Sequence, residues 1–198
     1  KPDINFSEAL FSIEIIDNKK AIRFGLGAIK GVGIKSISQM IKERKKNGVF
    51  ENVIDFLDRV NSDVVNKRQL EKLIQAGAFD SIENNRSKLF INVSRFVELY
   101  GSQREQDQNL LFEDRKILFE DKNLFIQKLK NWTYLETLKN ELEVIGFYFS
   151  DHPLRYFPQQ FFKFENIENF NQINKNENIS SSLLSGAVLD IKERSNKD

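Results

Sequence analysis

A turn built on two glycines constrains the fold of this chain more than any other feature. Gly31-Val32-Gly33 lies between two segments, 26–29 and 34–41, whose apolar residues recur at helical spacing. The glycines permit a tight turn and let the backbone come close to an external group. The helix after the turn begins with backbone N–H groups that have no partner within the helix, and Lys35 adds a positive charge beside them. The stretch therefore predicts a helical hairpin that binds a nucleic-acid phosphate.

Two other glycine motifs that bind phosphate fail on spacing. A dinucleotide-binding fold needs G-x-G-x-x-G, whereas the glycines of residues 25–31 give G-x-G-x-x-x-G and no βαβ unit follows. A Walker loop needs Lys and then Ser or Thr directly after its last glycine, but here Ile34 separates Gly33 from Lys35. The remaining alternative is a plain helical turn whose glycines only cap and pack.

Length and composition indicate a soluble globular protein. The 198 residues are 40% hydrophobic and include 18 Phe, which is enough to fill the core of one large domain or two small ones. No apolar run approaches the roughly 18 residues that span a bilayer, and residues 1–5 are not a secretory signal. With no Cys and one His, the chain offers no disulfide and little for a metal. We expect a cytoplasmic chain with no structural metal and no membrane partner.

The positive charge is concentrated around the glycine turn. The net charge of the whole chain is +1, but residues 19–88 contain 15 Lys/Arg against 8 Asp/Glu. A charged segment is usually only a solvated surface. Because this one coincides with a hairpin suited to phosphate, it favours a nucleic-acid partner.

The segments around the turn are predicted to be a β-hairpin and two helices. Strands at 11–16 and 21–24 flank a turn at 17–20. The helix after the glycine turn is expected to end near Asn47-Gly48, with the glycine as its C-cap. A short amphipathic helix at 53–60 then leads to the next element.

A second helix, turn and helix follow this connector. Asn66 and Gln69 resemble a capping box at the start of a helix. After a turn at 77–80, the next helix keeps one apolar face. The pattern therefore occurs twice, in 24–46 and 66–101, as a tandem helix-hairpin-helix arrangement. Two such hairpins can grip both DNA backbones across a minor groove.

The rest of the chain is less regular. Residues 102–122 are polar and acidic apart from Leu110-Leu111-Phe112, which is either a tether onto the protein's own core or a docking peptide for a partner. Apolar spacing predicts one long helix over 123–145, with Trp132 in its core. Residues 183–192 predict a lone strand, which cannot satisfy its own ladder groups. We therefore expect the chain to stop just inside a further β domain.

Four motifs resemble the alpha subunits of bacterial DNA polymerase III, the C-family replicative polymerases. They are Phe24–Gly33 (FGLGAIKGVG), Asn66-Lys67-Arg68, Leu73–Asp80 (LIQAGAFD) and Glu143–Leu154 (EVIGFYFSDHPL), in the family's order over nearly the whole chain. The resemblance implies a mainly α fold with a short N-terminal β-hairpin, a tandem helix-hairpin-helix domain and a truncated C-terminal OB-fold strand. It implies these domains: 1–23, the end of the fingers; 24–101, the DNA-binding hairpins; 102–122, a clamp-docking loop; 123–178, a helical connector; and 179–198, the start of the OB-fold.

The resemblance also implies function and partners. In this family the hairpin domain holds duplex DNA behind the polymerase active site, and a following loop carries a pentapeptide that docks into the sliding clamp, the beta subunit. Gln108-Asn109-Leu110-Leu111-Phe112 is similar to that pentapeptide in position and pattern. The family's catalytic carboxylates, which hold two metal ions, precede this segment. We therefore expect no catalytic residue and no cofactor here, Mg²⁺ in the full-length polymerase, and other polymerase III holoenzyme subunits as further partners.

These arguments give one set of candidate DNA-binding residues and two rival functions. The candidates are Lys30, Gly31, Val32, Gly33, Lys35, Ser36, Lys67, Arg68, Gly77, Arg86 and Lys88. The first rival is the helix-hairpin-helix module of a DNA-repair enzyme, which would bind DNA without affinity for a clamp. The second is a purely structural helical spacer, which would bind neither.

Overall fold

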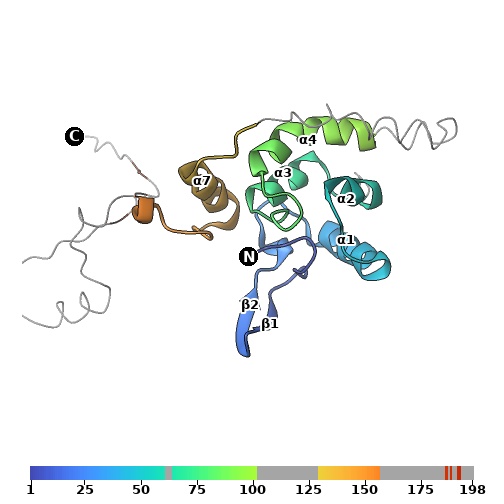
Figure 1. Ribbon diagram of the computed structural model, residues 1–198, viewed down its shortest axis with the longest axis horizontal. Coiled ribbons are helices and arrows are strands. Elements are labelled where there is room, and N and C mark those ends of the chain that lie inside the picture. The colour runs from blue at the N-terminus through green and yellow to red at the C-terminus, as the bar shows by residue number, and fades with distance from the viewer. Residues whose placement is uncertain (61–63, 102–128, 157–185, 187, 189–190, 193–198) are drawn as a thin grey trace, which may run out of the picture. The chain divides into compact units, whose positions relative to one another are not determined.

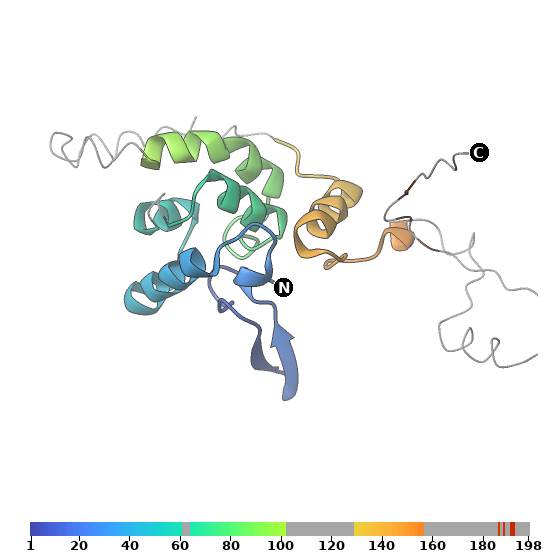
Figure 2. The ribbon, with the colours of Figure 1, turned by 180° about the vertical axis from the view of Figure 1, so that it is seen from behind.

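The chain is mainly helical, with a β-hairpin near its N-terminus. The computed structural model describes residues 1–60, 64–101, 129–156, 186, 188 and 191–192. Residues Lys1–Ser150 form one compact unit and Asp151–Asp198 a second, in which a 3-10 helix covers Pro153–Tyr156. The described part of the first unit contains β1 (Ser12–Ile16), β2 (Lys19–Arg23), a 3-10 helix (Leu26–Ala28), α1 (Ile34–Asn47), α2 (Val53–Arg59), α3 (Lys67–Gln75), α4 (Arg86–Gly101) and α7 (Tyr134–Ile145) (Figures 1 and 2).

The β-hairpin has a tighter turn than the sequence predicts. β1 and β2 pair antiparallel, with Ile16 opposite Lys19, so the turn consists of Asp17 and Asn18 alone. Both residues have positive φ, 50° and 60°. Two successive left-handed residues form the two-residue turn whose twist matches that of the strands, and Asp and Asn tolerate this conformation. Lys19 and Lys20 therefore belong to β2, and the prediction of a turn over 17–20 is wrong.

The first long helix and the connector agree with the prediction. α1 begins after Gly33 and ends at Asn47, where Gly48 has a φ of 89° and its N–H bonds the carbonyl of Arg44. The side chain of Asn52 caps α2 by accepting from the N–H of Asp55 at 3.0 Å. Both helix ends are therefore set by local capping residues.

The second hairpin consists of α3, the turn after it and α4. Asn66 caps α3 by accepting from the N–H of Gln69 at 3.1 Å, as the capping box predicts. The return bond is not made, because the side-chain oxygen of Gln69 is buried without a hydrogen-bond partner among the described residues. Gly77, with a φ of 77°, ends the helix, and Asn85 caps α4 by accepting from the N–H of Lys88.

A single apolar core joins the helices of the first unit. Phe56 makes edge-to-face contacts with Phe50 and Phe79, with both pairs of ring centroids 5.0 Å apart. Met40 from α1 and Leu73 from α3 are fully buried in the same cluster. Burial of one such side chain contributes roughly 1.5–3 kcal/mol. The core thereby fixes the positions of the two hairpins within one unit.

The last helix of the first unit is shorter than the sequence predicts. Residues 129–133 are not helical, and α7 begins at Tyr134 behind a reciprocal capping box between Thr133 and Glu136. The prediction of helix through 129–133 is wrong because this cap starts a helix at Tyr134, whereas apolar spacing alone gives no signal of a helix start there. Trp132 packs edge-on against Phe90 of α4, with centroids 5.5 Å apart, and is partly buried.

α7 packs against both hairpins. The carbonyl of Val144 accepts from the N–H of Lys30 at 2.8 Å, which attaches α7 to the first hairpin. On the second hairpin, Gln75 of α3 donates to the side chain of Asn140 at 2.8 Å. The helix therefore bridges the two hairpins within the first unit. The expected strand at 183–192 lies mostly outside the described residues, and the predicted domain boundaries stay predictions.

Candidate nucleic-acid interface

The glycine turn of the first hairpin exposes its backbone because the buried side chain of Val32 anchors the turn to the core. The Val32 side chain is buried in the core, and its N–H bonds the carbonyl of Ile29 at 3.1 Å. Gly31, with a φ of 81°, is exposed at the tip of the turn. Only a residue without a Cβ adopts this backbone readily. The sequence thus folds so that the glycine side of the turn faces outward.

The amino end of α1 is open to an anion. Gly33 is its N-cap residue, and no side chain caps the helix. The first turn carries no acidic residue, but it carries the exposed Lys35 and the half-buried Ser36. The first N–H groups of a helix have no intrahelical acceptor, and the helix dipole makes this end positive. A phosphate against Gly33 would meet backbone donors and the Lys35 ammonium together.

α3 lies beside this glycine turn. A Cβ added to Gly31 would be 3.7 Å from Cγ of Lys72 and 3.9 Å from Nε of Arg68. A Cβ added to Gly33 would be 3.5 Å from Nε2 of Gln69. The structure therefore brings Arg68 to the first hairpin, together with Lys72 and Gln69, which sequence reasoning missed. The spacing of four residues between Arg68 and Lys72 places both on one face of a helix and could have revealed Lys72.

Lys30 is exposed, and its side-chain amine lies close to the carboxyl end of α7. A Cβ added to Gly146 would be 3.6 Å from the Nζ of Lys30. Gly146 is the left-handed C-cap of α7, so this ammonium lies near the negative end of the helix dipole. Lys67 is exposed at the first position of α3. Both lysines remain at the surface of the two hairpins.

The turn of the second hairpin is closed by a buried arginine. Any Cβ at Gly77 would overlap the guanidinium of Arg86, and both residues are buried. The guanidinium donates to Asp80 at 2.6 and 2.8 Å and to Glu141 of α7 at 2.9 Å. Burial lowers the pKa of Arg86, but the hydrogen bonds and charges of the two carboxylates outweigh it and raise that pKa. These contacts give Gly77 and Arg86 structural roles, and their assignment as phosphate contacts stays a prediction that the packing does not favour.

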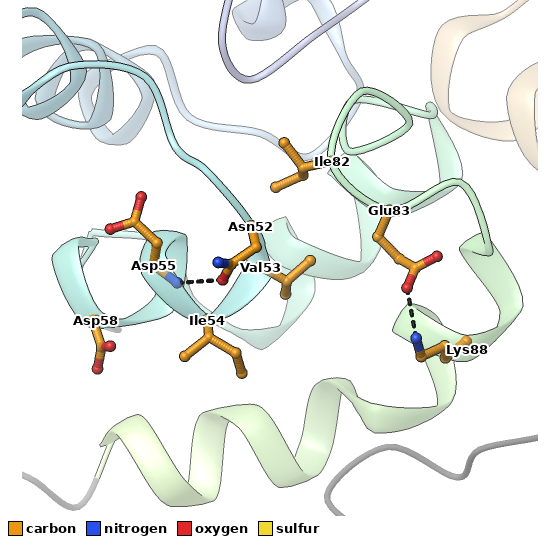
Figure 3. A pocket seen from close by; sticks show the side chains of 8 residues that line it. All are labelled: Asn52, Val53, Ile54, Asp55, Asp58, Ile82, Glu83 and Lys88. Atoms are coloured by element: carbon orange, nitrogen blue, oxygen red, sulfur yellow. Dashed lines mark hydrogen bonds and ion pairs between the residues drawn. The ribbon is translucent and has the colours of Figure 1, made fainter. Parts of the chain in front are cut away.

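Lys88 forms an ion pair with Glu83. Its Nζ lies 2.6 Å from a carboxylate oxygen of Glu83, on one side of a cavity of about 500 Å³ (Figure 3). Burial raises the pKa of Glu83, but the hydrogen bond from Lys88 and one from the backbone of Asn85 outweigh it and lower that pKa. The α2 side of this cavity carries Asp55 and Asp58. Carboxylates on both sides of the cavity disfavour a phosphate there, so the assignment of Lys88 as a DNA contact stays a prediction that this geometry does not favour.

Glu141 is a buried structural partner of Arg86 that sequence reasoning missed. Only 1% of Glu141 is exposed, and it accepts from Arg86 and from the N–H groups of Phe149 and Ser150 at 3.1 and 2.8 Å. Its position in the apolar stripe of α7, three residues from Leu138, was a signal of burial.

The candidate clamp-binding residues, Gln108 to Phe112, lie outside the described residues. Within the part of the chain that is described, no helix has both the length and the apolar character to cross a membrane.

Comparisons with known proteins match the first part of the chain to a helix-hairpin-helix motif. The family described as "Helix-hairpin-helix motif" matches residues 1–89. The chain is 37% identical over 158 residues, 78% of its length, to DNA polymerase III subunit alpha of Borreliella burgdorferi. It is 37% identical over 160 residues, 80% of its length, to the subunit of the same name from Neisseria meningitidis serogroup B.

A third relative of that name, from Buchnera aphidicola, is 29% identical over 205 aligned residues and matches 100% of the chain. The aligned regions make up only 13%, 14% and 17% of these three relatives, so the chain spans a small part of their length.

Proposed function

The chain is a relative of the DNA polymerase III alpha subunits and corresponds to one segment of them, and we propose that this segment binds the backbone of duplex DNA through its first hairpin. The observation that carries the proposal is the uncapped amino end of α1, which lies directly behind the exposed glycine turn and beside Lys35. Phosphate binding by the amino end of a helix needs free N–H groups and a nearby cation, and this hairpin offers both.

Binding at this site is independent of base sequence. The groups that the first hairpin presents are backbone amides and the side chains of Lys35 and Ser36, which reach phosphates rather than base edges. Contacts of this kind fix the position and orientation of a protein on the duplex but carry no information about the bases. The segment would hold DNA while the duplex moves past it.

A salt series on the 198-residue chain tests this proposal. With roughly four phosphates neutralised, affinity for duplex DNA falls by about 10²-fold between about 50 and 200 mM salt. The variant Lys35→Glu reverses the charge at the open helix end and should weaken binding at low salt. A flat salt response, or equal binding by Lys35→Glu, contradicts the proposal.

Clamp docking by Gln108 to Phe112 is a second part of the proposed function. It is supported by the similarity of this pentapeptide to the family's clamp-docking motif and by its polar flanks, Gln103 to Asp107 and Glu113-Asp114. Leu111 and Phe112 have the apolar character that a partner pocket would bury. The sliding clamp, the beta subunit, is therefore the proposed protein partner, within a cytoplasmic polymerase III holoenzyme.

The chemistry of the full-length protein is also a proposal, based on the name of the relatives. It is template-directed nucleotidyl transfer, for which Mg²⁺ supplies charge stabilisation on the phosphates. Within the described residues of this chain, no three His, Asp or Glu side chains gather as a metal ion would require. The described residues do not fit such a metal site, and no catalytic step is derived from them.

A further inference from the structure

The turn of the second hairpin has no room and the wrong charge for a phosphate. The Arg86 guanidinium fills the space over Gly77, and the Asp80 carboxylate lies at the turn itself, with 32% of its side chain exposed. A DNA phosphate approaching this turn would meet a carboxylate, while the one buried cation there is already paired. A symmetric grip by two glycine turns is therefore not available to this chain.

The amino end of α4, the helix that follows the second turn, differs from that of α1, the helix that follows the first turn. The side chain of Asn85 accepts from the N–H of Lys88 and so occupies one of the donors that a phosphate would need. The amino end of α1 has no such cap. The amino end of α1 is therefore open, whereas that of α4 is capped by its own Asn85.

α3 instead places two positively charged side chains beside the first hairpin. Arg68 and Lys72 are four residues apart on one helix face, and both lie beside Gly31, at 3.9 Å (Nε) and 3.7 Å (Cγ) from the position of its missing Cβ. Arg68 is exposed, and among the described residues its guanidinium has no ion-pair partner. Lys72 is held by Gln75 at 3.0 Å and by the exposed Glu143 of α7 at 2.6 Å.

We infer that the second hairpin contributes to DNA binding through α3 and not through its turn, so that Arg68 and the open end of α1 form one composite site for adjacent phosphates of a single strand. This inference rests on the proposed function and specifies its site. An arginine fork beside backbone amides matches phosphate geometry and adds charge-assisted hydrogen bonds. Glu143 holds Lys72 next to this site and opposes an incoming phosphate by its own charge.

Charge variants at the two turns and on α3 test the inference, with duplex affinity and its salt dependence as the readouts. Arg68→Ala should weaken binding about fivefold at about 50 mM salt and reduce the slope of log affinity against log salt by about 0.9, the value of one phosphate contact. The matched control is Lys46→Ala, which removes the same charge from α1 eleven residues after Lys35, about 16 Å along the helix. This control should leave the slope unchanged.

Two further variants separate the composite site from a symmetric grip. Ser81→Glu adds a negative charge at an exposed position beside the second turn and should change affinity less than twofold, whereas Lys35→Glu at the first turn should weaken binding at least tenfold. Glu143→Gln removes the charge beside Lys72 and should strengthen binding about twofold to threefold.

The outcomes distinguish a failure of the inference from a failure of the proposed function. If Lys35→Glu weakens binding but Arg68→Ala behaves like Lys46→Ala, the inference is overturned and the proposed function stands. An equal loss from Ser81→Glu and Lys35→Glu has the same meaning. If the unsubstituted chain binds duplex DNA without salt dependence, the proposed function itself fails.

Discussion

Glu141 and Arg86 form an ion pair of 2.9 Å inside the first unit, with 1% and 7% of their side chains exposed. The pair joins α7 to the start of α4, although 55 residues separate the two partners in sequence. The same carboxylate accepts from the backbone of Phe149 and Ser150. Glu141 therefore attaches α7 and the residues after it to the second hairpin, in addition to the hydrogen bond between Gln75 and Asn140.

Breaking this ion pair should strongly destabilise the fold. Glu141→Leu leaves the guanidinium of Arg86 with one carboxylate partner instead of two and leaves the N–H groups of Phe149 and Ser150 without this acceptor. Removal of one partner of a buried pair costs about 3–5 kcal/mol, which urea unfolding monitored by circular dichroism would measure. Lys45→Ala removes an ion pair whose side chains are 62% and 41% exposed and serves as the control, with an expected change below about 1 kcal/mol. A loss of the same small size in Glu141→Leu would show that the buried pair is not essential.

Gly33→Asp should separate folding from DNA binding. Gly33 has a φ of −82° and room for a Cβ, because the nearest atoms would be 3.5 and 3.6 Å away. An aspartate at this N-cap position bonds the free N–H groups of α1 and should leave the free energy of unfolding unchanged or raise it by up to about 1 kcal/mol. The same carboxylate occupies the proposed phosphate site, so duplex affinity should fall at least tenfold.

Gly33→Asn is the matched variant for this test, since it caps α1 without adding a charge. It should give a smaller loss of affinity than Gly33→Asp. If Gly33→Asp binds DNA as tightly as the unsubstituted chain, the amino end of α1 is not the phosphate site.

Because the pKa of Glu83 is lowered in the folded protein, the free energy of unfolding should decrease as the pH falls into the acid range. A carboxyl whose pKa is lower in the folded than in the unfolded protein stabilises the fold fully above its unfolded pKa, about 4.3. This contribution is lost as the pH falls through the lowered pKa of the folded state. Glu83→Gln should therefore be less stable than the unsubstituted chain at about pH 6, and the difference should shrink toward about pH 3. Urea unfolding at the two pH values measures it, and a difference that does not change with pH would contradict the assignment.

Lys88→Met tests the ion pair between Lys88 and Glu83 from the side of the lysine. Because Lys88 donates the side-chain hydrogen bond that lowers the pKa of Glu83, its loss should remove most of the same pH-dependent contribution. What remains is the burial of Glu83, which raises its pKa, opposed by the hydrogen bond from the N–H of Asn85, which lowers it.

The elements that could be predicted from sequence are those that local signals determine. Gly48 ends α1 and Asn52 begins α2 because the backbone groups that they satisfy lie within four residues of them. The prediction of helix through 129–133 failed where two local signals conflict. Apolar spacing continues across Thr133, but its capping box with Glu136 starts a new helix at Tyr134.

The part of the candidate site on the first hairpin was predictable from sequence, whereas the part on the second hairpin was not. The glycine turn and Lys35 are neighbours in sequence, so their positions follow from one helix start. In the sequence, Arg86 and Arg68 are equally good candidates for a phosphate contact, but Arg86 is buried and Arg68 is exposed. The difference depends on Glu141, whose approach to the second hairpin is a tertiary contact that spacing along the chain does not encode.

The 198-residue chain should incorporate no nucleotide by itself. Two-metal catalysis needs carboxylates gathered around the reacting phosphate, and no such group occurs within the described residues. A primer-extension assay with purified chain, primer-template, Mg²⁺ and all four nucleotides should show no product, and a catalytic DNA polymerase in the same assay is the positive control. Extension that persists through repeated purification would place an active site in this chain.

The last prediction concerns Gln108 to Phe112. Burial of the Leu111 and Phe112 side chains in a clamp pocket would contribute roughly 1.5–3 kcal/mol each, and ordering of the peptide would offset part of that, so a micromolar dissociation constant is expected. Replacing both residues by Ala should abolish binding to the sliding clamp and leave the melting temperature nearly unchanged, because residues that dock to a partner are not core. Titration calorimetry and thermal unfolding of the same double variant test both halves of the prediction. Asn109→Ala, inside the same pentapeptide, is the control and should retain most of the affinity. If the double variant loses thermal stability but still binds the clamp, the cluster is a tether onto the protein's own core, and docking must be assigned to other residues.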